Sequence, residues 1–152
     1  MPQFRAVPVA DALANELLSE YFSYRAESFP TPSGYVTTYP VSEQFEPPRG
    51  VFVVIEDAGS VLGCGGIRQL DPGRFEVKHL WVRPQGRGAG LGRRLVAELE
   101  RRAREWGVSE LVLDTNESLE AAGGLYRSSG FETCEPYNEN PNATTWYRKL
   151  LS

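Results

Sequence analysis

Residues 82–95 of the chain read Val-Arg-Pro-Gln-Gly-Arg-Gly-Ala-Gly-Leu-Gly-Arg-Arg-Leu, with glycines at 86, 88, 90 and 92. An apolar, strand-like segment precedes this stretch, and a segment with helical periodicity follows it. Glycines allow several consecutive backbone N–H groups to turn toward one point. The first turn of a helix adds its unpaired amides and the positive end of its dipole. We therefore expect this stretch to bind an anion, in the first place a phosphate group.

The spacing of the glycines excludes two common phosphate-binding motifs. A dinucleotide-binding fingerprint requires Gly-x-Gly-x-x-Gly, but counting from Gly88 and Gly90 places Arg93 at the third glycine. A Walker A loop ends in Gly-Lys-Ser/Thr, and the stretch contains no Lys, Ser or Thr. The pattern that remains is Arg-x-x-Gly-x-Gly at Arg87, Gly90 and Gly92. A flexible turn needs fewer glycines, and each glycine inside a helix costs about 1 kcal/mol, so close approach of a ligand explains them better.

Length and composition indicate one globular domain. The chain has 152 residues, which is a usual domain size and enough to bury a core without disulfides or metals. Hydrophobic residues make up 41% of the chain and charged residues 24%, as in soluble globular proteins. We therefore treat residues 1–152 as a single domain.

No segment predicts a membrane or nucleic-acid partner. No apolar run approaches the roughly 20 residues of a membrane span, and residues 1–5 lack the residue order of a signal peptide. The net charge is −4 and there is no basic tract, which disfavours nucleic-acid binding. A cytoplasmic protein is the expectation.

The two cysteines predict neither a disulfide framework nor a metal site. Cys64 and Cys134 lie in apolar or β-like segments, with no Cys-x-x-Cys spacing and no adjacent histidine. We expect buried free thiols and no bound metal.

Periodicity and turn signals predict an α/β fold in the order β-α-β-β-β-α-β-α-β-β, with one short helix at 42–45 in a loop region rich in Pro, Ser and Thr. The expected strands are 4–7, 51–55, 61–68, 75–82, 111–113, 131–134 and 145–150, and the expected helices begin after Asp11 and at 91 and 119. The strand before the glycines, the helix after them and strand 111–113 form a parallel crossover. The result is a single mixed sheet of about six to seven strands with helices on both faces.

Three motifs together resemble the GNAT superfamily of acyl-CoA-dependent N-acyltransferases. Strand 75–82 resembles the strand that precedes the family's CoA loop, and Arg87-x-x-Gly90-x-Gly92 resembles that loop. The run Leu-Tyr at 125–126 with Gly-Phe at 130–131 resembles a later signature of the family. The resemblance covers the chain from residue 51 to residue 151. Segments 136–141 and 146–149 are similar to a bacterial subgroup whose substrates are mostly unassigned.

The resemblance implies an N-acetyltransferase that transfers an acetyl group from acetyl-CoA to a primary amine by direct single displacement. Backbone amides across 87–93 would bind the CoA pyrophosphate, and strand 75–82 would splay from strand 111–116 to form a slot for pantetheine and the acyl group. A main-chain N–H near 80–82 would polarise the acyl carbonyl. The CoA-binding residues implied are Leu80, Trp81, Val82, Arg87, Gly88, Ala89, Gly90, Leu91, Gly92, Arg93, Asn116 and Tyr126.

The same resemblance implies two catalytic residues. Tyr126 matches the family tyrosine whose hydroxyl lies near the CoA sulfur and protonates the leaving thiolate, and the alternative is a core aromatic residue. Glu76 occupies a strand position where many members carry a catalytic glutamate. An alkyl amine has a pKa of about 10.4, so a base must accept its proton, directly or through water. The alternative for Glu76 is a solvent-exposed strand residue.

Two further polar residues have more than one interpretation. Strand alternation points His79 away from Glu76 and Lys78, so His79 is structural if that face packs on a helix. Asn116 either hydrogen-bonds the pantetheine arm or caps the helix that follows. Leu119 stands where the family pattern often has an asparagine, which leaves both roles open.

The acceptor pocket is expected between the first helix, residues 28–50 and the C-terminal segment. Aromatic residues available to line this pocket, or a homodimer contact, are Tyr21, Tyr24, Tyr35, Tyr39, Trp81, Tyr137 and Trp146. Four glutamates could attract a cationic amine, although a solvated acidic face is the commoner arrangement: Glu20, Glu27, Glu43 and Glu46. A small-molecule amine is the preferred acceptor. The alternatives are a protein N-terminus or lysine, and a regulatory module that binds CoA without turnover.

Overall fold

A computed structural model describes residues 1–151, except the side chain of Glu120. The elements follow the order β1 (Gln3–Ala6), α1 (Ala12–Ser28), η1 (Ser42–Phe45), β2 (Gly50–Asp57), β3 (Ser60–Asp71), β4 (Arg74–Val82), η2 (Pro84–Gly86), α2 (Leu91–Glu105), β5 (Glu110–Thr115), α3 (Glu120–Ser128), β6 (Glu132–Cys134) and β7 (Thr145–Leu150). The predicted α/β order is confirmed, with the short turn η2 in addition.

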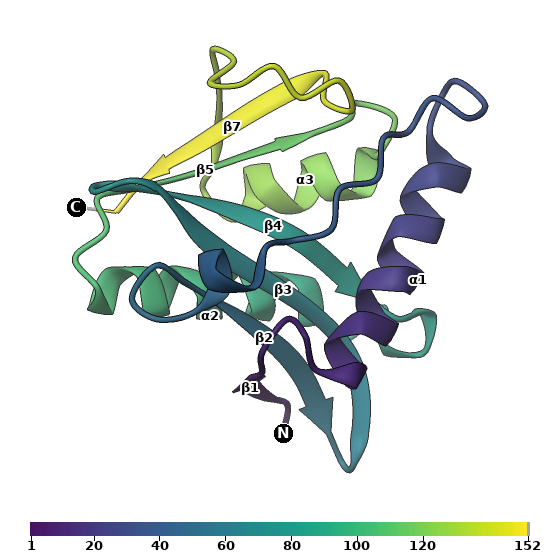
Figure 1. The fold of residues 1–152 in the computed structure, drawn as a ribbon, viewed down its shortest axis with the longest axis vertical. Coiled ribbons are helices and arrows are strands. Elements are labelled where there is room, and N and C mark those ends of the chain that lie inside the picture. The colour runs from purple at the N-terminus through teal and green to yellow at the C-terminus, as the bar shows by residue number, and fades with distance from the viewer. Residues whose placement is uncertain (152) are drawn as a thin grey trace.

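The strands form one mixed sheet of seven strands in the order β1-β2-β3-β4-β5-β7-β6 (Figure 1). Only β4 and β5 are parallel, because the crossover through α2 joins them. Their ladder runs from Arg74 opposite Glu110 to Glu76 opposite Val112 and then ends. Beyond those residues the two strands separate, as the sequence predicted.

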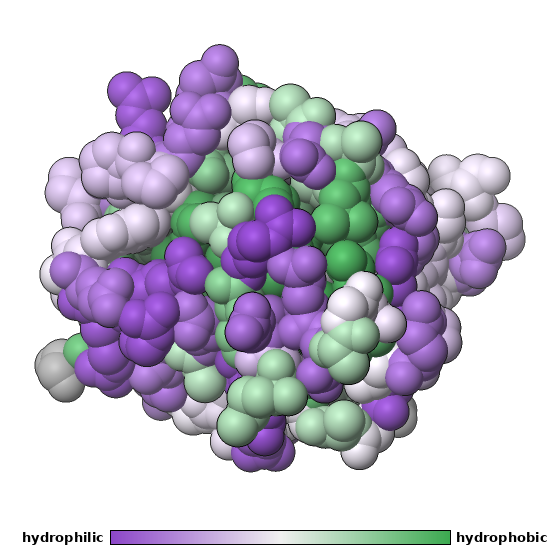
Figure 2. Space-filling model, turned by 90° about the horizontal axis from the view of Figure 1, so that it is seen from below, coloured by the Kyte–Doolittle hydropathy of each residue, from purple (hydrophilic) through white to green (hydrophobic). Residues whose placement is uncertain are grey.

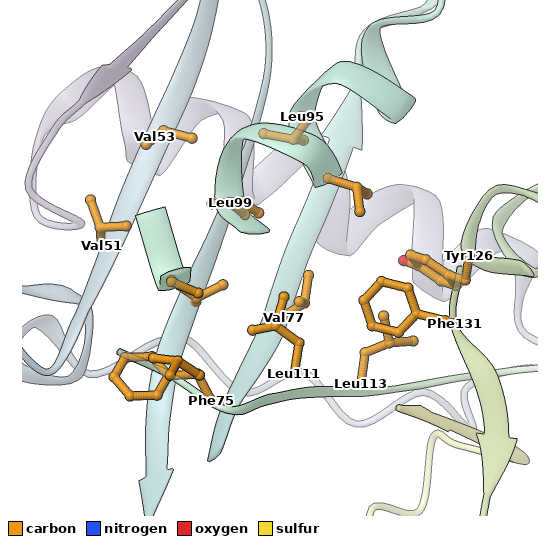
Figure 3. Packing of buried hydrophobic residues seen from close by; sticks show 14 of the residues in the cluster. Val51, Val53, Phe75, Val77, Leu95, Leu99, Leu111, Leu113, Tyr126 and Phe131 are labelled. Carbon is orange, nitrogen blue, oxygen red and sulfur yellow. The ribbon is translucent and has the colours of Figure 1, made fainter. Parts of the chain in front are cut away.

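One face of the sheet packs against α2 and α3. Leu95 and Leu99 on α2 are fully buried above Val77 of β4 and Leu111 of β5 (Figure 3). Tyr126 of α3 belongs to the same core cluster. Apolar positions one turn apart on α2 point toward the sheet because they follow the helical period. This packing fixes the helix that follows the glycine loop.

The other face packs against α1 and η1. Asp11 begins α1 by accepting a hydrogen bond from the Leu13 amide at 2.9 Å. About two turns before the end of α1, Glu20 accepts two hydrogen bonds from Arg83, at 2.9 and 2.8 Å, and one from the Trp81 indole at 3.0 Å. Glu20 therefore ties α1 to the end of β4, and its carboxylate is engaged within the protein.

A bulge in β4 changes which way its side chains point. The register shifts between the pair Gly66–Lys78 and the pair Cys64–Trp81, and His79 has a positive φ of 61°. One extra residue in a strand interrupts the alternation of faces. His79 therefore packs on the α1 face, the same face as Lys78, and the predicted opposite orientation is wrong.

Aromatic rings surround His79 on that face. Its ring centroid lies 5.7 Å from that of Tyr21, 5.6 Å from Phe22 and 5.8 Å from Phe45. Only 7% of the residue is exposed, and its buried Nδ1 has no hydrogen-bond partner among residues 1–151. Burial, helped by the positive charge of Lys78, lowers the pKa of His79 to about 3. The imidazole is therefore neutral near neutral pH.

The surface and the cysteines complete the description. The face that lies lowest in Figure 1 carries mostly polar side chains, with apolar side chains showing between them near its centre (Figure 2). No helix among the described residues is both long and apolar enough to cross a membrane. Both cysteines are free thiols, as predicted, but only Cys64 is buried, and Cys134 is partly exposed.

Replacing His79 with Phe should flatten the pH dependence of stability below neutrality. The folded chain keeps His79 neutral down to about pH 3, whereas the unfolded chain protonates it near its ordinary pKa of 6.5. Below pH 6.5 the unfolded state therefore binds a proton that the folded state does not bind. The contribution of His79 to the free energy of unfolding is full above pH 6.5 and is lost as the pH falls toward 3. Urea unfolding between about pH 7 and pH 4 should show a steeper loss of unfolding free energy in the wild type than in His79→Phe.

The slopes are compared rather than the absolute stabilities, because Phe at a positive φ is itself strained. Equal slopes in the two proteins would contradict a buried, neutral His79.

Candidate functional site

The glycine loop forms one wall of a groove, and α3 forms the other. The groove has a volume of about 530 Å³. Val82, most of the loop residues 86–93, and Ala121, Gly124, Leu125 and Ser128 line it. A Cβ at Gly92 would lie 3.3 Å from Leu125, so this glycine lets α2 approach α3 closely. The groove is therefore lined mainly by backbone on the loop side.

The backbone of the loop leaves a run of amides unpaired. Gly88 and Gly90 have φ values of 88° and 74°, in the left-handed region that favours glycine. The Arg87 amide bonds to the Pro84 carbonyl at 3.2 Å, and the Arg94 amide bonds to the Gly90 carbonyl at 3.1 Å. Between them, the amides of residues 88–93 find no acceptor within the described part of the chain. Unpaired amides at the start of a helix are the arrangement that an anion site requires. Binding of a phosphate by these amides stays a prediction.

The arginines of the loop are held by other groups. The Arg87 guanidinium donates to the Val82 carbonyl at 3.1 Å and lies 5.1 Å from the centre of the Trp81 ring. The Arg93 guanidinium donates to the Ser128 hydroxyl at 3.1 Å. Both arginines line the groove, so they add positive charge beside the free amides.

A second cavity opens where β4 and β5 separate. It has a volume of about 530 Å³ and lies between α1, residues 35–44, the second half of β4, the end of β5, α3 and residues 138–142. Ala121 lines both this cavity and the groove of the glycine loop, so the two adjoin. The cavity and the groove therefore lie next to each other at Ala121 of α3.

Tyr126 lies near this junction. Tyr126 is 8% exposed, and its ring packs against that of Phe131 with a centroid separation of 6.1 Å (Figure 3). The ring centroid of Tyr147 lies 5.8 Å from that of Tyr126. Tyr126 lines the cavity, and its hydroxyl forms no hydrogen bond with any described residue. Burial raises the pKa of Tyr126 above its ordinary value, so the hydroxyl keeps its proton at neutral pH. The residue is thus a core aromatic with an available hydroxyl group.

Glu76 is buried, so the alternative of a solvent-exposed strand residue is wrong. Its exposed fraction is 0%. Arg68 pairs with one carboxylate oxygen at 2.8 Å, and the Tyr137 hydroxyl donates to the other at 2.5 Å. Glu76 does not line the cavity, although Arg68 does. Its role as a base stays a prediction.

Asp114 is a site residue that the sequence analysis missed. It is the one acidic side chain that lines the cavity among the side chains the structure describes. Its Oδ2 accepts a hydrogen bond from Asn138 at 2.7 Å. Asp114 sits at the carboxyl end of a parallel strand, where open α/β sheets bind their ligands, and that position was the available signal.

Asn116 has both ends of its amide engaged. Its Nδ2 donates to the Asn142 carbonyl at 3.1 Å, and its Oδ1 accepts from the Ser118 amide at 3.0 Å. Asn116 is buried and is absent from the lining of both cavities. The cap position of α3 is Leu119, so Asn116 shapes the turn before the helix and does not cap it. Its contact with pantetheine stays a prediction.

The segment 80–82 divides between the two cavities. Leu80 lines the acceptor side and Val82 lines the groove, while the Trp81 side chain is buried toward α1. Trp81 can therefore contact a ligand in these cavities only through its backbone. The segment lies on the edge of β4 that no longer pairs with β5, and this edge borders the site.

The cavity is aromatic and carries more cations than acids. Tyr21, Tyr24, Tyr35 and Tyr39 line it, as predicted, but the other aromatic candidates Trp81, Tyr137 and Trp146 do not. None of the four glutamates considered for amine attraction lines it either. Its charged residues are Arg25, Arg68, Lys78 and Asp114. Among the described side chains, no group of three or more His, Cys, Asp or Glu residues could hold a metal ion.

Comparisons with known proteins agree with this geometry. The model of the acetyltransferase (GNAT) family matches residues 11–131. An uncharacterised N-acetyltransferase of Schizosaccharomyces pombe is 41% identical over 109 residues, covering 70% of this chain and 67% of that protein. An IAA acetyltransferase of Azospirillum brasilense is 33% identical over 134 residues, covering 88% of this chain and 85% of that protein.

A solved structure shares the fold. The crystal structure of an acetyltransferase of the GNAT family from Staphylococcus aureus matches with a TM-score of 0.81 at 16% identity, covering 99% of this chain and all of that one. The matched family region contains the glycine loop and the Leu-Tyr and Gly-Phe segments on which the predicted resemblance rested. The chain belongs to the GNAT family of acetyltransferases.

Proposed function

We propose that this acetyltransferase transfers an acetyl group from acetyl-CoA to the primary amine of a small molecule by direct single displacement. The observation that carries the proposal is the adjacency of two cavities. Unpaired amides line the groove, and the tyrosine-lined cavity next to it includes the available hydroxyl of Tyr126. Each part matches one task of the reaction. The amides bind the donor, the tyrosine assists its leaving group, and the cavity binds the acceptor.

The glycine loop fits the pyrophosphate of CoA. The amides of residues 88–93 offer their hydrogens to phosphate oxygens, and the missing Cβ atoms of Gly88 and Gly90 leave room for close approach. Beyond Glu76 the β5-facing edge of β4 has no strand partner. The peptide-like pantetheine arm can lie along such an edge as an added strand does. An N–H near Leu80 then polarises the thioester carbonyl.

The reaction requires two proton transfers. The amine loses a proton, its nitrogen forms a bond to the acyl carbon, the carbon–sulfur bond breaks, and the thiolate accepts a proton. Tyr126 is the proton donor that the family resemblance implies, and its hydroxyl lines the cavity and carries its proton at neutral pH. Glu76 is the base implied by the family resemblance, but Arg68 and Tyr137 engage both of its oxygens. Asp114 lines the cavity and is the better-placed base.

Replacing Tyr126 with Phe should lower kcat by roughly 10²- to 10³-fold and leave the affinity for acetyl-CoA unchanged, because only the proton donor is lost. Thiol release with an amine panel measures kcat, and calorimetry measures affinity. Tyr147→Phe is the matched control, since this buried tyrosine contacts Tyr126 but does not line the cavity. Equal activity of Tyr126→Phe and wild type would exclude the acid role. Binding of acetyl-CoA without thiol release from any small amine would favour a protein acceptor or a module without turnover.

Replacing Gly90 with Ala should weaken acetyl-CoA binding by about tenfold or more, because the methyl group strains the left-handed backbone and projects into the loop that binds phosphate. Gly107→Ala is a close control. Gly107 has the same φ of 74° and equally open surroundings, but it follows α2 and does not line the groove. Both variants should lose about 1 kcal/mol of stability. Equal affinities for acetyl-CoA would contradict the assignment of the loop.

Substitutions of Asp114 and Glu76 should show which of the two carboxylates acts as the base and which has a structural role. Asp114→Asn should lower kcat by roughly 10²-fold, because the group that accepts the amine proton is lost. Glu76→Gln should mainly lower the melting temperature, because it leaves the partly buried Arg68 guanidinium without its counter-charge. Thermal unfolding and kcat of both variants test this division. An unchanged kcat in Asp114→Asn and a lowered kcat in Glu76→Gln would reverse the assignment.

A further inference from the structure

Two cations that line the acceptor cavity have no carboxylate partner. Arg25 on α1 and Lys78 on β4 form no salt bridge with any side chain that the structure describes. Arg68, the third cation of the lining, is already paired with Glu76 at 2.8 Å. A partly buried cation without a counter-charge is costly, because water no longer fully solvates it. The cavity thus has positive charge that its own residues leave uncompensated.

Tyrosines hold the Arg25 guanidinium in place. The Arg25 Nη1 donates to the Tyr21 hydroxyl at 2.9 Å, and the guanidinium carbon lies 5.8 Å from the centre of the Tyr21 ring and 5.1 Å from that of Tyr35. Stacking on aromatic rings orients a guanidinium and leaves most of its five N–H donors available. An oriented guanidinium with open donors is suited to pair with a carboxylate in a two-bond geometry.

The cations gather on one side of the cavity. Arg25 donates to the Tyr21 hydroxyl at 2.9 Å, and the Tyr21 ring centroid lies 5.7 Å from that of His79. Lys78 precedes His79 directly in β4, and the bulge places both residues on the α1 face. Arg25 and Lys78 therefore reach the same part of the cavity from a helix and a strand that are distant in sequence.

Asp114 supplies the opposite charge in the same cavity. It lies at the end of β5, on the strand that borders the opening toward the glycine loop. A ligand that matches this cavity needs one group for the carboxylate of Asp114 and an anionic group for Arg25 and Lys78. A compound with both a primary amine and a carboxylate has these two groups.

We infer that the acceptor is an amine that also carries a carboxylate, such as a free amino acid. This inference rests on the proposed function. Arg25 and Lys78 bind the carboxylate, and the amine lies toward Asp114 and the thioester. An amino acid within or at the start of a protein has an amide in place of this carboxylate, so such acceptors lack the group that the two cations bind. Recognition of charge at both ends also selects against simple alkyl amines.

Matched acceptors provide the test. A panel of L-amino acids is compared with their primary amides and with the amines that lack the carboxyl group, using acetyl-CoA and thiol release. We expect kcat/KM for the acid at least about tenfold above that for the amide and the plain amine of the same side chain. Equal or higher kcat/KM for the amides would overturn the inference and leave the proposed acetyl transfer intact.

Substitutions of Arg25 and Lys78 test whether these two cations cause the preference for the acid over the amide. Arg25→Gln and Lys78→Gln should each raise KM for the preferred amino acid about tenfold with little change in kcat, and should raise KM for the amide of the same side chain by less. Arg25→Lys keeps the charge and should retain part of the preference. Arg49→Gln is the control, because this exposed arginine lies outside the cavity. An unchanged preference for the acid in both Gln variants would contradict the assignment of the two cations.

A binding measurement separates this inference from the proposed function. If acetyl-CoA binds but no amine in the panel releases thiol, the proposed function fails, and the CoA-bound protein is then titrated calorimetrically with amino acids and with their amides. Binding of acids alone supports carboxylate recognition without turnover. Equal binding of acids and amides, or binding of neither, contradicts it.

Discussion

The end of hydrogen bonding between β4 and β5 after Glu76 and Val112 is the constraint on which the rest of the site depends. Each strand stays fixed by its other neighbour, β4 by β3 and β5 by β7. The sheet therefore opens without losing its order, and the α2 and α3 side becomes connected with the α1 side. The bulge at His79 lies in this open half of β4 and turns the following residues. Donor groove and acceptor cavity meet because of this opening.

Much of the fold could be predicted from local sequence. Alternating apolar residues, turn signals and the helical period gave the element order, because each depends on neighbours within a few positions. The cap at Asp11 and the free cysteines followed in the same way. The bulge could not be predicted, because one inserted residue leaves no compositional mark. Alternation was therefore correct up to Lys78 and wrong at His79.

The sequence predicted the parts of the site that lie in contiguous motifs and missed those that depend on contacts between distant residues. Tyr126 and the glycine loop belong to contiguous motifs, and they line two adjoining cavities. The charge of the acceptor cavity depends on pairing between distant residues, which no local pattern reveals. The buried pair of Glu76 with Arg68 decides which charges remain uncompensated. The sequence therefore left acidic attraction of an amine open beside a solvated acidic face, and the described lining carries cations and a single carboxylate.

Helix α1 contacts both halves of the site within about one and a half turns. Glu20 holds Arg83 and Trp81 at the end of β4, and Arg25, about 7.5 Å further along the helix axis, faces the acceptor cavity. The helix therefore acts as a fixed spacer between the two halves. The acceptor preference can change when the α1 residues that face the cavity are replaced, as long as Glu20 keeps its contacts. A shift of the whole helix would also move the end of β4 and so alter the donor half. Acceptor specificity can therefore evolve by exchange of side chains, whereas movement of the α1 backbone is restrained.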